Sequence, residues 1–153
     1  MYIHLLLPTD GSALSEAAIQ AGVTLAKSLG ARVTGLYVKP ALPPHERLDL
    51  WEPDDAQALR RMEELAEQRS QRYLSVIEAA ATERGVPCEC VSVSGTAPFE
   101  DIIRVARERG CDFIFMASHG RKGVAGLLLG SETVKVLTHT HIPVLVHRAP
   151  ARS

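Results

Sequence analysis

Length, composition and charge describe one ordinary globular domain. The chain has 153 residues, of which 46% are hydrophobic and 23% charged, and its formal net charge is −1. This length can bury a substantial core, and the balanced charge excludes a surface built to coat nucleic acid, which needs a basic excess. No apolar run approaches a membrane span and no basic leader comes first, so we expect a cytoplasmic protein without nucleic-acid or membrane partners.

The cysteines do not form a recognised metal or redox motif. Cys88 and Cys90 alternate within a strand-like run and therefore point to one face, while Cys111 stands apart and no Cys-x-x-Cys occurs. We predict buried free thiols in a reducing compartment rather than a metal or redox site. His139 and His141 lack a third ligand, so they are not expected to bind a metal either.

Hydrophobic periodicity predicts strands that alternate with helices. The first unit is an apolar strand over residues 3–7 that stops at Pro8, a turn, and a helix capped by Ser12 or Ser15 that ends at Gly30. The later elements follow in this order: strand 32–38, a proline-rich segment with Trp51, a long helix from Asp54 or Asp55 to Gly85, strand 88–93, a helix with Thr96 as cap and Pro98 in its first turn, strand 113–116, a helix with Ser131 as cap that runs to about His139, and strand 142–147. This order predicts an α/β fold, a single open parallel five-stranded sheet with helices on both faces, Rossmann-like, over residues 1–147, with 148–153 as a flexible tail.

A glycine-rich basic loop follows the fourth predicted strand. Glycines recur at Gly120, Gly123, Gly126 and Gly130, with Arg121 and Lys122 between them, and a helix start comes next. Backbone N–H groups without neighbouring Cβ atoms, together with the positive end of a helix dipole, favour an anion such as a phosphate chain. The alternative is that the glycines only let the chain turn between strand and helix.

A second polar segment follows the first predicted strand. In an open parallel sheet, ligands bind at the carboxyl ends of strands where the strand order reverses. If residues 8–12 and 117–131 are neighbours there, Asp10 faces the glycine loop and could bind a base, a ribose or Mg²⁺. The alternative is structural, because Asp-Gly-Ser is also a good turn and cap sequence.

Several motifs together resemble one known family. They are Pro-x-Asp-Gly-Ser after the first strand, Tyr-Val at the end of the second, the long second helix, Ser-His-Gly-Arg, Leu-Leu-Leu-Gly-Ser and the closing Ile-Pro-Val-Leu-Val. Over the whole chain this combination resembles the universal stress proteins. The nucleotide-binding branch has Gly, two residues, Gly, nine residues, then Gly-Ser or Gly-Thr. Gly120 and Gly130-Ser131 match that pattern, whereas Ala117 replaces the first glycine. This change adds only a methyl group if φ is negative, but it impairs binding if the position needs positive φ or if the ligand packs against Cα.

The resemblance implies a set of ligand contacts for ATP or AMP, possibly with Mg²⁺. Val38 would meet adenine through its backbone, Met116 and Ala117 would line the floor, and His119 would touch the ribose. The residues beside the nucleoside would be Pro8, Thr9 and Asp10, and those around ribose and phosphates would be Gly120, Arg121, Gly130, Ser131, Glu132 and Thr133. The resemblance also implies a homodimer through the last strand, at Val144, Leu145 and Val146.

Three functions follow from these patterns. The first is a stress-response module that senses or signals through nucleotide occupancy and a dimer; the others are a slow ATPase and a dimerising interaction protein without nucleotide. The sequence has no P-loop motif. Ser118 and His119 are adjacent, which predicts diverging side chains, and no carboxylate completes a triad, so no catalytic residue is assigned.

Overall fold

The computed structural model describes residues 2–41, 53–120 and 129–149. Strands and helices alternate along the chain, as the periodicity predicts. The elements are β1 (His4–Thr9), α1 (Ala13–Leu29), β2 (Arg32–Pro40), α3 (Pro53–Arg84), β3 (Cys88–Gly95), α4 (Pro98–Glu108), β4 (Phe113–Ala117), α5 (Ser131–His139) and β5 (Val144–His147). The proline-rich segment with Trp51 and the end of the predicted tail, residues 150–153, lie outside the described residues.

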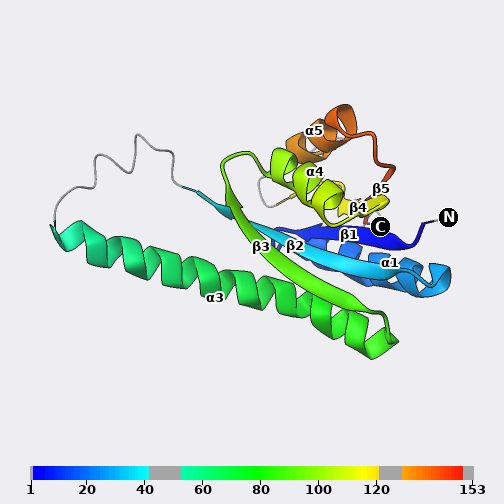
Figure 1. Cartoon of the computed structure of the whole chain (residues 1–153), viewed down its shortest axis with the longest axis horizontal. Helices are drawn as coiled ribbons and strands as arrows, with labels where there is room; N and C mark the ends of the chain where they lie inside the picture. Colours follow the sequence, from blue (N-terminus) through cyan, green and yellow to red (C-terminus); the bar gives the residue numbers. More distant parts are fainter. Residues whose placement is uncertain (1, 42–52, 121–128, 150–153) are drawn as a thin grey trace.

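The five strands form one open parallel sheet in the order β3-β2-β1-β4-β5. Helices α1 and α3 cover one face, and α4 and α5 cover the other (Figure 1). Side chains alternate between the two faces, so that Leu5 and Leu7 pack in the core under α1 and α3 while Leu6 packs in the core under α4 and α5. The predicted fold class is therefore confirmed, and the strand order reverses between β1 and β4.

The prediction that Pro8 ends the first strand was wrong, because β1 continues to Thr9. Backbone groups of odd-numbered residues in β1 face β2, since Arg32 N donates to Ile3 O, and those of even-numbered residues face β4, since Asp112 N donates to His4 O. Pairing with β4 reaches only Leu6, whereas pairing with β2 runs to Thr9. The N–H that Pro8 lacks would point to a side where no ladder bond is needed.

Helix starts show where local sequence rules are overridden. Ser12 is the N-cap of α1, as predicted, and its hydroxyl accepts from Ser15 N. The other three starts differ from the predictions: Ala97 rather than Thr96 is the N-cap of α4, Gly130 rather than Ser131 is that of α5, and α3 already begins at Pro53, so Asp54 and Asp55 lie inside the helix. Pro98 occupies the first turn of α4, as predicted.

Helix α3 packs along only part of its length. Ile77 and Ala80 in its second half are buried against the sheet, whereas Met62 and Leu65 in its first half are 51% and 58% exposed. The first half extends past the sheet in Figure 1. Over the three described ranges, no helix has both the length and the apolar character that a bilayer crossing requires.

The three cysteines are free thiols in the structure. Cys88 and Cys90 point to one face, as predicted, but both are only partly buried. Cys111 is fully buried on the opposite side of the sheet, and this burial raises the pKa of its thiol to about 11.

Candidate functional site

The two polar segments predicted to meet do so at the switch point between β1 and β4. The two strands are neighbours in the sheet, so their carboxyl ends lie side by side. A Cβ placed on Gly120 would come 2.6 Å from Asp10 Oδ2, which puts the carboxylate directly against the start of the glycine loop. A side chain at position 120 would displace the Asp10 carboxylate, so this arrangement requires a glycine there. The expected neighbourhood of Asp10 and the loop is therefore present.

Asp10 also organises the turn that follows β1. Its Oδ1 accepts from Ser12 N at 2.9 Å and from Ser15 Oγ at 2.7 Å, and Thr9 Oγ1 accepts from Gly11 N at 3.1 Å. The alternative that Asp10 serves the turn is thus confirmed for Oδ1, while Oδ2 faces the loop. The role of Ser15 was missed by sequence reasoning, which considered its hydroxyl only as a cap.

The start of α5 is fixed onto the end of β4 by short polar contacts. Gly130 N donates to Ser118 O at 2.7 Å, and Thr133 Oγ1 donates to Ala117 O at 3.0 Å and to Ser118 O at 3.2 Å. A Cβ on Gly130 would lie 3.1 Å from His119 Cα and 3.2 Å from Ser118 O. Gly130 has φ −71°, so glycine is required there for close backbone approach and not for an unusual conformation.

Glu132 ties α5 to α4. Its Oε2 accepts from Phe99 N at 2.9 Å, in the first turn of α4, where the cap residue itself makes no side-chain bond. Its Oε1 lies 3.5 Å from Lys135 Nζ. The Glu132 side chain is therefore engaged with the neighbouring helix. The phosphate contact that the resemblance implies for Glu132 would be made through its backbone N–H, which belongs to the start of α5.

The N-terminus of α5 can hold negative charge. The helix has nine residues, and the first N–H groups of any helix have no intrahelical acceptor. These groups and the positive end of the dipole favour an anion. Ser131, the first helical residue, is exposed and can add a hydroxyl donor. The basic residues Arg121 and Lys122 of the loop lie outside the described residues, as do Gly123 and Gly126.

Ala117 fits its position without backbone strain. It is the last residue of β4, is 8% exposed, and its methyl group packs in the core with Leu7 and Phe115. None of the non-glycine residues in the described ranges has positive φ. Positive φ, one of the two conditions under which alanine would impair binding, therefore does not apply at Ala117.

The remaining candidate residues line the adjoining strand ends. Val38 is partly buried near the end of β2, where it pairs with Val93, and Pro8 pairs with Leu36 of the same strand. Met116 is 6% exposed and packs in the core on the α4 side. The structure thus brings together the ends of β1, β2 and β4 with the start of α5.

Ser118 and His119 do not diverge, contrary to the sequence prediction. Ser118 Oγ and His119 Nδ1 are 3.0 Å apart, so the two side chains are hydrogen-bonded. Ser118 is only 4% exposed, however. Its carbonyl holds the end of β4 onto α5 by accepting from Gly130 N and Thr133 Oγ1, and its hydroxyl is engaged with His119. The pair is placed to shape the loop, since a buried hydroxyl is not open to a substrate.

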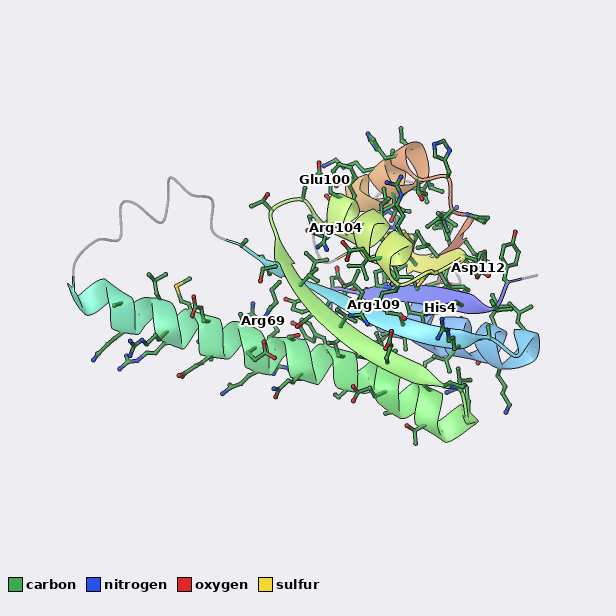
Figure 2. All side chains as sticks on the ribbon, viewed as in Figure 1. His4, Arg69, Glu100, Arg104, Arg109 and Asp112 are labelled. Carbon is green, nitrogen blue, oxygen red and sulfur yellow. The ribbon has the colours of Figure 1, made fainter. Side chains whose placement is uncertain are left out.

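A separate titratable group, His4, lies at the amino-terminal ends of the strands, opposite to the candidate site. Figure 2 labels His4 and Asp112 there. His4 is 2% exposed, its Nε2 is 2.7 Å from Thr34 Oγ1, and its backbone N–H donates to Asp112 Oδ1 at 3.1 Å. Burial, with a smaller effect from Arg32, lowers the pKa of His4. This cluster is placed to affect stability and not the ligand site.

The outer side of α4 and α5 carries an open depression whose lining includes none of the candidate ligand residues. Its lining residues are Phe99, Glu100, Ile103, Arg104, Arg107, Glu108 and His139. Arg104, labelled with Glu100 in Figure 2, is bound by Asp101 at 2.9 Å and by Glu108 at 3.2 Å. The lining as a whole holds Arg104 and Arg107 together with Glu100 and Glu108. Because the two signs balance, the depression attracts an anion less than the start of α5 does.

Comparison with known proteins agrees with the motifs and the topology. The family model "Universal stress protein family" matches residues 1–148. Universal stress protein MJ0531 of Methanocaldococcus jannaschii is 30% identical over 156 residues, which cover 99% of this chain and 85% of that protein. The protein YxiE of Bacillus subtilis, also a universal stress protein, is 30% identical, with 97% of this chain and 100% of that protein covered.

Solved structures give the same result. The structure of hypothetical protein MJ0577 matches with a TM-score of 0.76 at 26% identity and covers 99% of both chains. Two more distant structures share the fold: an Arabidopsis thaliana universal stress protein family protein with AMP bound (16% identity, TM-score 0.68, 97% and 93% covered) and a universal stress protein in complex with cAMP (21% identity, TM-score 0.63, 96% and 97% covered). The chain belongs to the universal stress protein family.

Proposed function

We propose that this stress-response protein binds an adenine nucleotide at the carboxyl ends of β1, β2 and β4 and acts as a nucleotide-dependent sensor or signalling dimer. The observation that carries the proposal is the start of α5, held on the end of β4 beside Gly120 and Asp10. A helix N-terminus that is fixed in place can bind phosphate without further ordering. The AMP and cAMP held by two proteins of the same fold support adenine nucleotides as the ligand class.

Most of the candidate residues have a distinct part in this proposal. The backbone of Val38 binds the adenine, with Pro8 and Thr9 beside the nucleoside, and Asp10 binds the ribose or, with ATP, Mg²⁺. Gly120 and Gly130 let the backbone approach closely, and the N–H groups of residues 131–133 bind the phosphates. Ala117 is compatible with the site because its methyl group is buried in the core and because its φ is not in the positive region.

A substitution at Ser131 separates ligand binding from folding. Ser131→Asp places a negative charge at the start of α5, where it stabilises the helix by about 0.3–1 kcal/mol but repels phosphate. We expect isothermal titration with ATP and AMP to show at least about a tenfold loss of affinity, equivalent to about 1.4 kcal/mol, with no loss of thermal stability. Ser131→Asn is the neutral control. Equal affinities of the Asp and Asn variants would reject the phosphate position.

The dimer is proposed to form through β5. This strand is at the edge of the sheet, and its Leu145 is 37% exposed. Backbone groups of odd-numbered residues face β4, because Ile114 N donates to Pro143 O and Ser118 N to His147 O. Val144 and Val146 therefore direct their backbone groups outward, where a second copy could pair.

Proline at one outward position tests this pairing. Val146→Pro removes an outward N–H while leaving the bonds to β4, so the dimer should dissociate to a folded monomer. Val146→Ala controls for the smaller side chain and should stay dimeric. Light scattering after gel filtration measures the mass. A Val146→Pro protein that remains dimeric at the lowest measurable concentration would exclude strand pairing at β5.

A further inference from the structure

Two cysteine sulfurs meet at the edge of the sheet opposite to β5. Cys88 and Cys90 lie on the same face of β3, an edge strand, and their Sγ atoms are 4.0 Å apart. Alternation along the strand brings both side chains to the α3 side. The nucleotide proposal gives these residues no part, and β1 and β2 separate them from β4.

Contacts with α3 and β2 position the two cysteine side chains and leave both of them partly exposed. Cys90 Sγ donates to Leu74 O of α3 at 3.8 Å and packs over Gly35, where an added Cβ would come within 2.8 Å of the sulfur. Gly35 thus provides the space that Cys90 occupies. Both cysteines remain partly exposed, whereas Cys111 is buried.

One carboxylate acts on both thiols. Glu78 of α3 acts electrostatically on Cys88 and Cys90, and its negative charge attracts a positive ion while it opposes loss of the thiol protons. Glu89 lies on the opposite face of the sheet, where it pairs with Arg109 at 3.1 Å. Sulfur is a soft ligand, which selects Cu(I) over hard cations such as Mg²⁺ and Ca²⁺.

The number of available ligands narrows the choice of metal ion further. Among the residues that the structure describes, no three His, Cys, Asp or Glu side chains are grouped so as to hold a metal. A structural zinc site needs four ligands. Two sulfurs at about 2.3 Å from one ion stand no more than about 4.6 Å apart, so the observed 4.0 Å is close to a bridged geometry.

We propose that Cys88 and Cys90 form a two-sulfur site for a soft monovalent cation, Cu(I). Binding replaces the two S–H bonds with two S–Cu bonds and releases two protons, and copper keeps its oxidation state. The site lies between β3 and α3 and is separate from the nucleotide site, so either can fail without the other.

The test is anaerobic titration of the reduced protein with Cu(I) against a chromophoric competitor, with native mass spectrometry for stoichiometry. We expect one Cu(I) per chain. Loss of an outer-shell partner alone costs a metal site about 10–100-fold, so Cys88→Ser or Cys90→Ser should weaken binding by at least about 100-fold. Cys111→Ser is the matched control and should bind like the unaltered protein.

A second measurement guards against variants that fold poorly. In the unaltered protein, one equivalent of Cu(I) should protect Cys88 and Cys90 from iodoacetamide, as read by peptide mass spectrometry. Undiminished binding by the Cys88→Ser/Cys90→Ser double variant would overturn the proposal. Unprotected cysteines in a copper-loaded protein, or no copper bound at all, would overturn it equally.

Discussion

The two glycines that frame the candidate site are needed for different reasons. A Cβ on Gly130 would press on the backbone of residues 118 and 119, whereas one on Gly120 would meet only the end of the Asp10 side chain. Backbone held by hydrogen bonds gives way less easily than a side chain. This difference also means that a bulky residue at Gly130 would disturb the loop itself and cannot serve as a clean test of phosphate binding.

We predict that Gly130→Ala costs about 1–3 kcal/mol of unfolding free energy, the usual range for overpacking. Gly120→Ala should cost less, because the Cβ meets only the Oδ2 end of the Asp10 side chain, whose displacement strains the two Oδ1 bonds but moves no backbone. Urea denaturation followed by circular dichroism measures both. Equal losses in the two variants would contradict the distinction between backbone and side-chain contact.

His4 should make stability depend on pH. Burial keeps its pKa in the folded state below the ordinary value of 6.5, so the unfolded chain takes up the proton more readily. The stabilisation is complete above pH 6.5 and is lost as the pH falls below it. We expect the unfolding free energy to decrease from pH 7 to pH 5, and to decrease less in His4→Gln. His141→Gln, at an exposed histidine, is the control and should keep the full decrease.

Residue-level prediction succeeded where the cause is local. Asp10 was recognised because a carboxylate after a buried strand suits both a turn and a ligand, and it serves the turn through Oδ1. The bond from Phe99 N to the Glu132 side chain was not foreseen, because the two residues are 33 positions apart in the chain. The Ser118–His119 bond was missed because sequence adjacency does not fix side-chain rotamers.

At the scale of elements, the link between α4 and α5 should contribute measurably. Glu132→Ala leaves Phe99 N without its acceptor, and the loss of a helix cap typically costs about 1 kcal/mol. Glu132→Gln keeps an acceptor oxygen and should lose less. Chemical denaturation of both variants tests this order. A Gln variant as destabilised as the Ala variant would show that the charge, and not the hydrogen bond, holds α4.

Element types were predicted more accurately than their ends. The periodic segments identify all of the described strands and helices, because the spacing of apolar residues reflects whether an element buries one face or both. The ends depend on neighbours. β3 extends to Gly95 because it pairs with β2 as far as Pro40, and β1 passes through Pro8 because pairing on its β4 side has already ended.

At the scale of the whole molecule, periodicity predicts a parallel sheet but not the order of its strands. Adjacency of β1 and β4 creates the site, yet these strands are separated by most of the chain. The resemblance to a family implied that β1 and β4 are adjacent. From the residues alone, this adjacency could only be assumed. The partly exposed first half of α3 was also not predicted, because apolar residues at helical spacing do not reveal whether a partner is present.

The central claim is that an adenine nucleotide occupies the switch point between β1 and β4. Native mass spectrometry of the freshly purified protein, before and after addition of Mg-ATP, tests it most directly, with denaturation to identify what is released. We predict one adenine nucleotide per chain in the unaltered protein and a marked loss of it in Ser131→Asp. A chain that carries no nucleotide, and still binds none with Mg-ATP in excess, would contradict the claim.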